Sequence, residues 1–173
     1  MTDIRCEPLA PTERARVAYV AAWLREWDRR ECFAYNGGAE GLIASTLAAA
    51  ARGPFAVCYL KGEEPFAVAF ATRVSLASPD LQCGLYATET WDEPGVSARV
   101  LRHLLAHVRP LLARRGGVLW AETMEGHPDA PTFLSRLGAR HVSSRVKHGH
   151  VWRRYEWRAR QRSSSRAKSA AVA

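Results

Sequence analysis

The sequence predicts an α/β (α+β) fold in which short strands alternate with about four helices. Three observations predict it. Short apolar runs of strand length alternate with amphipathic stretches of helix length, two of the runs are joined as in a hairpin, and glycine or proline marks most junctions. The chain has 173 residues, of which 47% are hydrophobic, so it is long enough for one domain with a sizeable core.

The first half of the chain is expected to contain a strand, two helices and a hairpin. The apolar positions after Thr12, a suitable N-cap, recur at spacings of three and four as far as Trp27 and predict the first helix. The second helix ends before Gly53 and Pro54. The expected ranges are 3–9 for the strand, 39–51 for the second helix, and 55–60 and 66–76 for the hairpin strands.

The second half adds a fourth strand, a long helix, a fifth strand, a short helix and one or two final strands. The long helix buries a stripe of leucine and valine, should bend near Pro110, and ends at basic residues followed by two glycines. The expected ranges are 81–90, 95–115, 118–123, 130–137 and 140–157. The predicted order is therefore β-α-α-β-β-β-α-β-α-β, within a single domain over residues 1–157.

Residues 92–97, Asp-Glu-Pro-Gly-Val-Ser, form the turn that opens the long helix. The first N–H groups of a helix have no partner within it, and the macrodipole places partial positive charge there, so a helix start can bind an anion through its backbone. Gly95 permits close approach of the ligand. The turn therefore predicts a site for the diphosphate of a cofactor.

This glycine turn, with the helix, strand and short helix that follow, resembles the acyl-CoA half of the GNAT N-acyltransferase superfamily. The order of elements is similar to the GNAT fold along nearly the whole chain, and this resemblance implies a mixed, mostly antiparallel central sheet flanked by the helices. In the family pattern Gln/Arg-x-x-Gly-x-Gly/Ala, Gly95 and the small Ser97 match, whereas Asp92 departs and Glu93 is a second acid. The resemblance implies that acetyl-CoA or another acyl-CoA is the co-substrate. The implied cofactor-binding residues are Leu85, Ala87, Gly95, Val96, Ser97, Ala98, Arg99 and Ala130.

The resemblance also implies catalytic candidates near the fourth and fifth strands. Attack by an amine needs a base, for which Glu122 and Glu89 are the candidates, although Glu122 can equally face solvent or pair with an arginine. Leu134 stands where the family usually has a tyrosine as general acid. His127 or Tyr86 could donate the proton instead, and His127 could also simply cap the short helix.

Three functions follow from these patterns. The first is a GNAT-like acyltransferase that moves an acyl group, most simply acetyl, from CoA to an amine acceptor of unknown identity. The second is a GNAT-related enzyme that modifies nucleic acid, similar to the Mom-like DNA-modifying enzymes. The third is a GNAT-fold binding module without catalysis, which would account for both departures from the family motifs.

The positive charge of the chain is concentrated at its C-terminal end. The formal net charge is +8, and the segment from Arg153 onward has seven basic residues and one acid, which leaves +2 for residues 1–152. Residues 158–173 lack apolar periodicity and are expected to form a basic, disordered tail. Such a tail could bind nucleic-acid phosphates or serve only as a solvated terminus.

Other sequence features exclude several classes of protein. The cysteines, at positions 6, 32, 58 and 83, lack paired spacing and are expected to be core thiols. His148 and His150 would need a further ligand to hold a metal, so no metal is expected. The chain has no 18-residue apolar run and no secretory signal, so we expect a cytoplasmic protein that does not bind membranes. We expect it to be a monomer or a homodimer.

Overall fold

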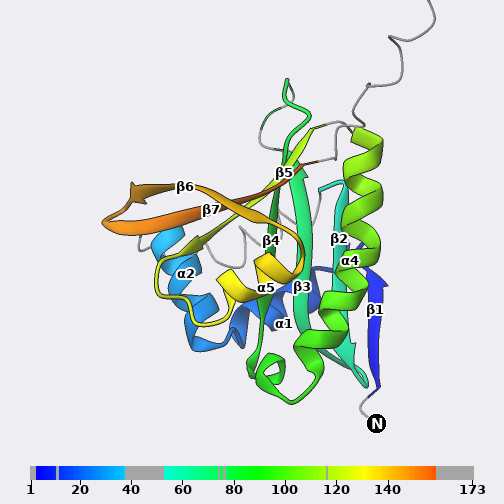
Figure 1. Ribbon diagram of the computed structural model, residues 1–173. Helices are drawn as coiled ribbons and strands as arrows, with labels where there is room; N and C mark the ends of the chain where they lie inside the picture. Colours follow the sequence, from blue (N-terminus) through cyan, green and yellow to red (C-terminus); the bar gives the residue numbers. More distant parts are fainter. Residues whose placement is uncertain are drawn as a thin grey trace, which may run out of the picture.

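The computed structural model describes residues 3–10, 12–37, 53–73, 75, 77–115 and 117–158. Within this part of the chain the strands form one seven-stranded sheet of order β1-β2-β3-β4-β5-β7-β6 (Figure 1). Its strands are β1 (Ile4–Pro8), β2 (Phe55–Lys61), β3 (Glu64–Arg73), β4 (Leu81–Ala87), β5 (Val118–Met124), β6 (Arg140–Lys147) and β7 (His150–Arg158). Every neighbouring pair is antiparallel except β4 and β5, which are parallel. The predicted mixed, mostly antiparallel sheet is thus confirmed.

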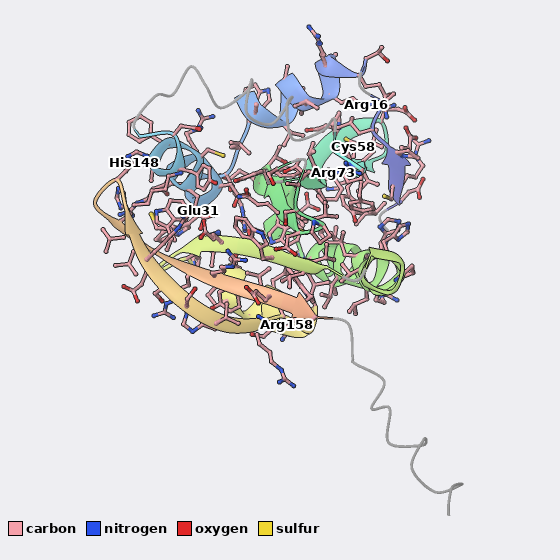
Figure 2. All side chains as sticks on the ribbon, turned by 90° about the horizontal axis from the view of Figure 1, so that it is seen from above. Arg16, Glu31, Cys58, Arg73, His148 and Arg158 are labelled. Carbon is pink, nitrogen blue, oxygen red and sulfur yellow. The ribbon has the colours of Figure 1, made fainter. Side chains whose placement is uncertain are left out.

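Helices cover both faces of the sheet. The described helices are α1 (Arg14–Ala22), α2 (Glu26–Tyr35), α4 (Val96–Arg115) and α5 (Ala130–Arg136), with a 3₁₀ helix, η2, at Glu89–Asp92. Figure 2, seen from above, shows α1 and α2 on one side of the sheet and α4 on the other. No helix in the described part of the chain combines the length and apolarity needed to cross a membrane.

The alternation of side chains along β3 explains why the sheet has a core on each face. Ala67, Ala69 and Ala71 join the cluster that packs under α4, whereas Val68 and Phe70 join the cluster under α1. Successive strand residues point to opposite faces, so a strand buried on both sides is apolar throughout. This accounts for the continuous apolar run from which β3 was predicted.

The predicted first helix is wrong in its extent. It was expected to run from Thr12 to Trp27, but α1 ends at Ala22 and α2 begins at Glu26. Between them Leu24 forms an isolated bridge with Thr88, and the Arg25 N–H donates to the Ala87 carbonyl at 3.0 Å. These backbone groups bond to the end of β4 instead of continuing the helix. The helix expected over 39–51 lies outside the described residues.

The predicted caps and ends differ at two further points. The N-cap of α1 is Glu13, without a side-chain cap, and not Thr12. The fourth strand ends at Ala87 and not at residue 90, because the Thr88 hydroxyl accepts from the Thr90 N–H and starts η2. Glu89 therefore lies on an exposed 3₁₀ turn and not at a strand end. The expected tail lies outside the described residues except for Arg158, the last residue of β7.

Candidate functional site

The sheet opens between β4 and β5. These two strands pair only at Leu81–Leu119 and Gln82–Trp120, near the start of each strand, and then diverge. The opening forms a cleft lined by residues of β3, β4, β5, α2, α4 and α5. The central sheet is thus continuous at one end and split at the other, and the split is where a ligand can enter the sheet.

The free edge of β4 presents backbone groups to this opening. The Thr88 N–H donates to the Phe66 carbonyl on β3. Along antiparallel strands, residues that bond to the neighbouring strand alternate with residues whose backbone groups point away from it. Leu85 and Ala87 therefore direct their N–H and C=O groups away from β3. At Ala87 both groups are used, because its N–H donates to Asp28 Oδ2 at 2.8 Å and its carbonyl accepts from Arg25. Leu85 lies in the split and pairs with no residue of β5. Its backbone can therefore bond to a ligand.

The cleft passes through the sheet and differs in character on the two sides. Toward α2 its polar lining residues are Arg25, Asp28, Glu31, Tyr35, Gln82, Tyr86 and Glu122. Toward α4 and α5 its apolar lining residues include Leu85, Leu104, Val108, Leu119, Phe133, Leu134, Leu137 and Trp157. A polar compartment and an apolar compartment thus meet in the gap between β4 and β5.

The polar compartment is built mainly by α2. Asp28, Glu31 and Tyr35 recur at spacings of three and four, which places them on one face of the helix. Asp28 and Glu31 are buried, at 2% and 8% exposed, although charged residues seldom occupy the buried face of a helix. This face was not among the predicted site residues. The signal in the sequence is that two acids lie on the same helix face as the apolar Cys32.

Arg25 connects three elements at the mouth of the cleft. Its Nε lies 3.0 Å from Asp28 Oδ2, and its Nη1 lies 3.1 Å from Asp92 Oδ1 and 3.0 Å from Asp129 Oδ2. Burial opposes the charge of the guanidinium, but the carboxylates outweigh it and raise the pKa of Arg25. The guanidinium also lies over the ring of Trp91. Arg25 thereby joins α2 to η2 and to the start of α5.

Both acids of the turn before α4 are paired with cations. Asp92 is bonded to Arg25, and both oxygens of Glu93 lie 2.5 Å from Lys61 Nζ. Gly95 has φ of 83°, in a turn that is closed by the Val96 N–H donating to the Glu93 carbonyl. The helical hydrogen bonds begin when Arg99 donates to Gly95, so the N–H groups of Ser97 and Ala98 are the orphan donors of this helix start.

His127 uses both ring nitrogens at the start of α5. Its Nδ1 accepts from the N–H groups of Asp129 and Ala130, each at 3.2 Å. Its Nε2 lies 3.5 Å from Asp28 Oδ1. The ring is buried and acts as the cap of the short helix, which was one of the two roles expected for it.

Glu31 is held between α2 and β5, where Figure 2 shows it. Its Oε1 accepts from the Thr123 hydroxyl and from the Met124 N–H, each at 2.5 Å. Burial raises the pKa of Glu31, although His127 and these two hydrogen bonds act in the opposite direction. A cleft carboxyl with a raised pKa is suited to take up a proton near neutral pH.

Solved structures resemble this chain, although no protein-family model and no curated protein matches its sequence. The ribosomal-protein-S18-alanine N-acetyltransferase of Escherichia coli is 15% identical, with a TM-score of 0.60 over 89% of this chain and 92% of that one. The GNAT domain of S. lividans PAT is 14% identical, with a TM-score of 0.65 over 89% and 90%. The yncA protein of Salmonella typhimurium, solved with its cofactor acetyl-CoA, is 11% identical, with a TM-score of 0.62 over 90% and 93%.

The chain has the GNAT fold. The likeness covers nearly the full length of these structures, in agreement with the resemblance found in the sequence. At these identities the likeness concerns the fold alone.

Within this GNAT fold, five of the catalytic and cofactor-binding candidates named from the sequence line the cleft: Leu85, Tyr86, Glu122, His127 and Ala130. The Glu122 side chain is only 3% exposed, and its Oε2 lies 2.6 Å from Arg145 Nη2, so it both lines the cleft and pairs with an arginine. Burial raises the pKa of Tyr86 well above its usual value, which keeps its hydroxyl protonated.

Other residues singled out from the sequence lie away from the cleft lining. Glu89 is exposed on η2. The predicted diphosphate site, residues 95–99, forms the first turn of α4 outside the lining. Ala87 has both backbone groups bonded to α2, as described above. Arg25, Asp28 and Glu31, which the sequence analysis did not single out, lie in the cleft instead.

Proposed function

We propose that this protein is an acyl-CoA-dependent N-acyltransferase that acts on an amine. The observation that carries the proposal is the cleft through the split sheet, with an apolar compartment on one side and carboxylates on the other. In the reaction a bond forms between the amine nitrogen and the acyl carbon while the thioester C–S bond breaks. One proton leaves the amine and one reaches the thiolate, so the two compartments match the needs of donor and acceptor.

The residues of the donor side fit a CoA thioester. The backbone of Leu85 offers one N–H and one carbonyl inside the gap, where an amide-bearing arm can continue the edge of β4. The start of α4 offers orphan N–H groups, and its two acids are neutralised by Arg25 and Lys61. A diphosphate therefore meets no unpaired carboxylate at Asp92 or Glu93.

The acceptor side fits an amine. Glu31 and Glu122 line the compartment next to α2 and attract a protonated amine. We assign the base to Glu31, because burial raises the pKa of Glu31 while Glu122 is ion-paired with Arg145. Glu122 then orients the amine. Tyr86 stays protonated and is assigned the donation of a hydrogen bond to the thiolate as the C–S bond breaks.

The alternatives have less support in the described part of the chain. The nucleic-acid reading rests on the tail, which lies outside the described residues. The reading as a non-catalytic module rests partly on the acidic turn, and pairing of Asp92 and Glu93 with cations weakens that argument. No described contact favours either over acyl transfer.

The test is thiol release from acetyl-CoA and longer acyl-CoA thioesters in the presence of a panel of primary amines. Glu31→Gln keeps a carbonyl oxygen that can accept the hydrogen bonds from Thr123 and Met124, but the amide cannot take up a proton. The value of kcat should therefore fall by a factor of about 10²–10⁴. Glu89→Gln, on the exposed η2, is the matched control and should leave kcat unchanged. Amine-dependent release that survives Glu31→Gln would contradict the assignment of the base, and absence of CoA binding would contradict the function.

A further inference from the structure

The apolar compartment of the cleft continues past the split and under α4. Its lining passes from Leu85 and Cys83 on β4 to Ala71 on β3 and on to Phe55 on β2. Cys83 pairs with Ala71 and Ala71 pairs with Phe55, so this lining crosses the sheet from strand to strand on one face. We call this part of the cleft, from Leu85 to Phe55, the apolar arm.

Small side chains leave the space for the apolar arm. Its floor on β3 is made by Ala69 and Ala71, and its roof on α4 is made by Leu104 and Val108, one helical turn apart. Valine or isoleucine is common on such a strand, whereas alanine adds little height to the floor, and both alanines are covered by their neighbours, at 2% and 1% exposed. At the far end lie the rings of Phe55 and His107, whose centroids are 5.7 Å apart.

The charged residues of the cleft lie outside the apolar arm. They are Arg25, Asp28, Glu31, Glu122 and Asp129, at the mouth or beside α2. Within the arm, burial raises the pKa of the Cys83 thiol to about 12, so the thiol stays neutral and behaves as a small apolar group. The arm can therefore be occupied by a hydrocarbon without leaving any of these charges unpaired.

We propose that the apolar arm holds the acyl chain of the donor, and that the transferred group is an unbranched chain longer than acetyl. This inference rests on the proposed function. Leu85, whose backbone faces the gap, also begins the arm, so a thioester near Leu85 would direct its acyl chain along the floor. Two strand spacings separate β4 from β2, about 10 Å, and an extended chain of about eight carbons spans that distance.

The first test measures binding to the wild-type protein by calorimetry, with CoA, acetyl-CoA and octanoyl-CoA as the probes. Each fully buried methylene raises affinity about fourfold, and the octanoyl chain has six more methylenes than acetyl. Because burial of the chain need not be complete, we expect octanoyl-CoA to bind at least about 100-fold more tightly than acetyl-CoA. Similar affinities for the two thioesters would overturn the inference and leave the proposed function intact. No binding of any of the three would overturn both.

The second test uses two matched variants on the floor strand. Ala71→Val places methyl groups in the arm, whereas Ala67→Val changes the same face of β3 at a position that does not line the cleft. Ala71→Val should lower the affinity for octanoyl-CoA at least about tenfold and change the affinity for acetyl-CoA by no more than about twofold, since only the longer acyl chain reaches residue 71. Ala67→Val should leave the ratio of the two affinities unchanged. An equal loss for both thioesters in Ala71→Val would overturn the inference.

Discussion

The two sides of the cleft are built by different forces. Toward α2, charged groups are fixed by ion pairs and hydrogen bonds, with Arg25 bonded to three carboxylates while only 7% exposed. Toward α4 and α5, apolar side chains are held by packing and leave space between them. Fixed charges suit a site that must orient a polar reactant, and an apolar space tolerates reactants of different length.

The difference also implies different responses to mutation. A charge removed from the polar side leaves its buried partner without compensation, whereas a methyl group added to the apolar side changes only the packing.

Arg25→Ala should be the most destabilising change. It leaves Asp28, which is 2% exposed, without its cation, and disconnects η2 and α5 from α2. Breaking a buried pair by removing one partner costs about 3–5 kcal/mol, so the free energy of unfolding in urea should fall by that amount. Arg153→Ala is the control, because Arg153 and Glu125 are 41% and 50% exposed and such a surface pair contributes less than about 1 kcal/mol. Equal losses in the two variants would mean that the Arg25 network is not energetically distinct.

Gly84→Ala should destabilise the polar side through sterics. A Cβ at Gly84 would lie 2.4 Å from Cζ of Phe70, whose ring also stacks on Tyr86. Both rings must move, which costs about 1–3 kcal/mol. Ala71→Val adds two methyl groups at a residue that lines the cleft and is itself 1% exposed, so in the same urea titration it should cost no more than Gly84→Ala. A larger loss for Ala71→Val would show that the apolar arm does not accept added volume.

The fold could be predicted because its signals are local. Each of β2, β3, β5 and α4 is encoded by neighbouring residues. The apolar runs of the strands and the apolar stripe of the helix can be recognised from the hydrophobic pattern of that segment alone. The break between α1 and α2 could not be predicted in this way. It depends on Leu24 and Arg25 bonding to Thr88 and Ala87, which are distant in the sequence and meet only in the folded chain.

The site could be predicted only in part, for a related reason. Glu122 was singled out because an acid interrupts an apolar strand, and it does line the cleft. Asp28 and Glu31 were overlooked because acids on a helix are usually solvated, and their burial depends on Arg25, Thr123 and the strands beyond them. Partners brought together by tertiary structure decide whether a charge is solvated or buried, and a single sequence does not contain that information.

The apolar side should make stability depend on alkaline pH. Burial raises the pKa of Cys83 from 9.0 to about 12, so the unfolded chain loses this proton first and stability falls as pH rises from about 9 to 12. At pH 10 this thiol alone should lower the free energy of unfolding by about 1 kcal/mol relative to pH 8. In Cys83→Ala the free energy of unfolding should therefore fall by about 1 kcal/mol less between pH 8 and pH 10 than in the wild-type protein, whatever the effect of the substitution at pH 8. An unchanged slope would mean that the Cys83 thiol ionises as readily in the folded chain.

The smallest effect should come from the ion pair beside the turn of α4. Lys61 and Glu93 are 35% and 41% exposed, so loss of the pair should cost less than about 1 kcal/mol of stability. If the start of α4 receives a diphosphate, Lys61→Ala leaves the Glu93 charge uncompensated there and should weaken CoA binding about twofold to fivefold, less so at high salt. Adding Glu93→Gln to Lys61→Ala should restore the affinity, because it removes the charge that Lys61 had neutralised. Calorimetric titration of CoA into the four members of this double-mutant cycle measures the coupling, and additive effects would place the diphosphate away from this turn.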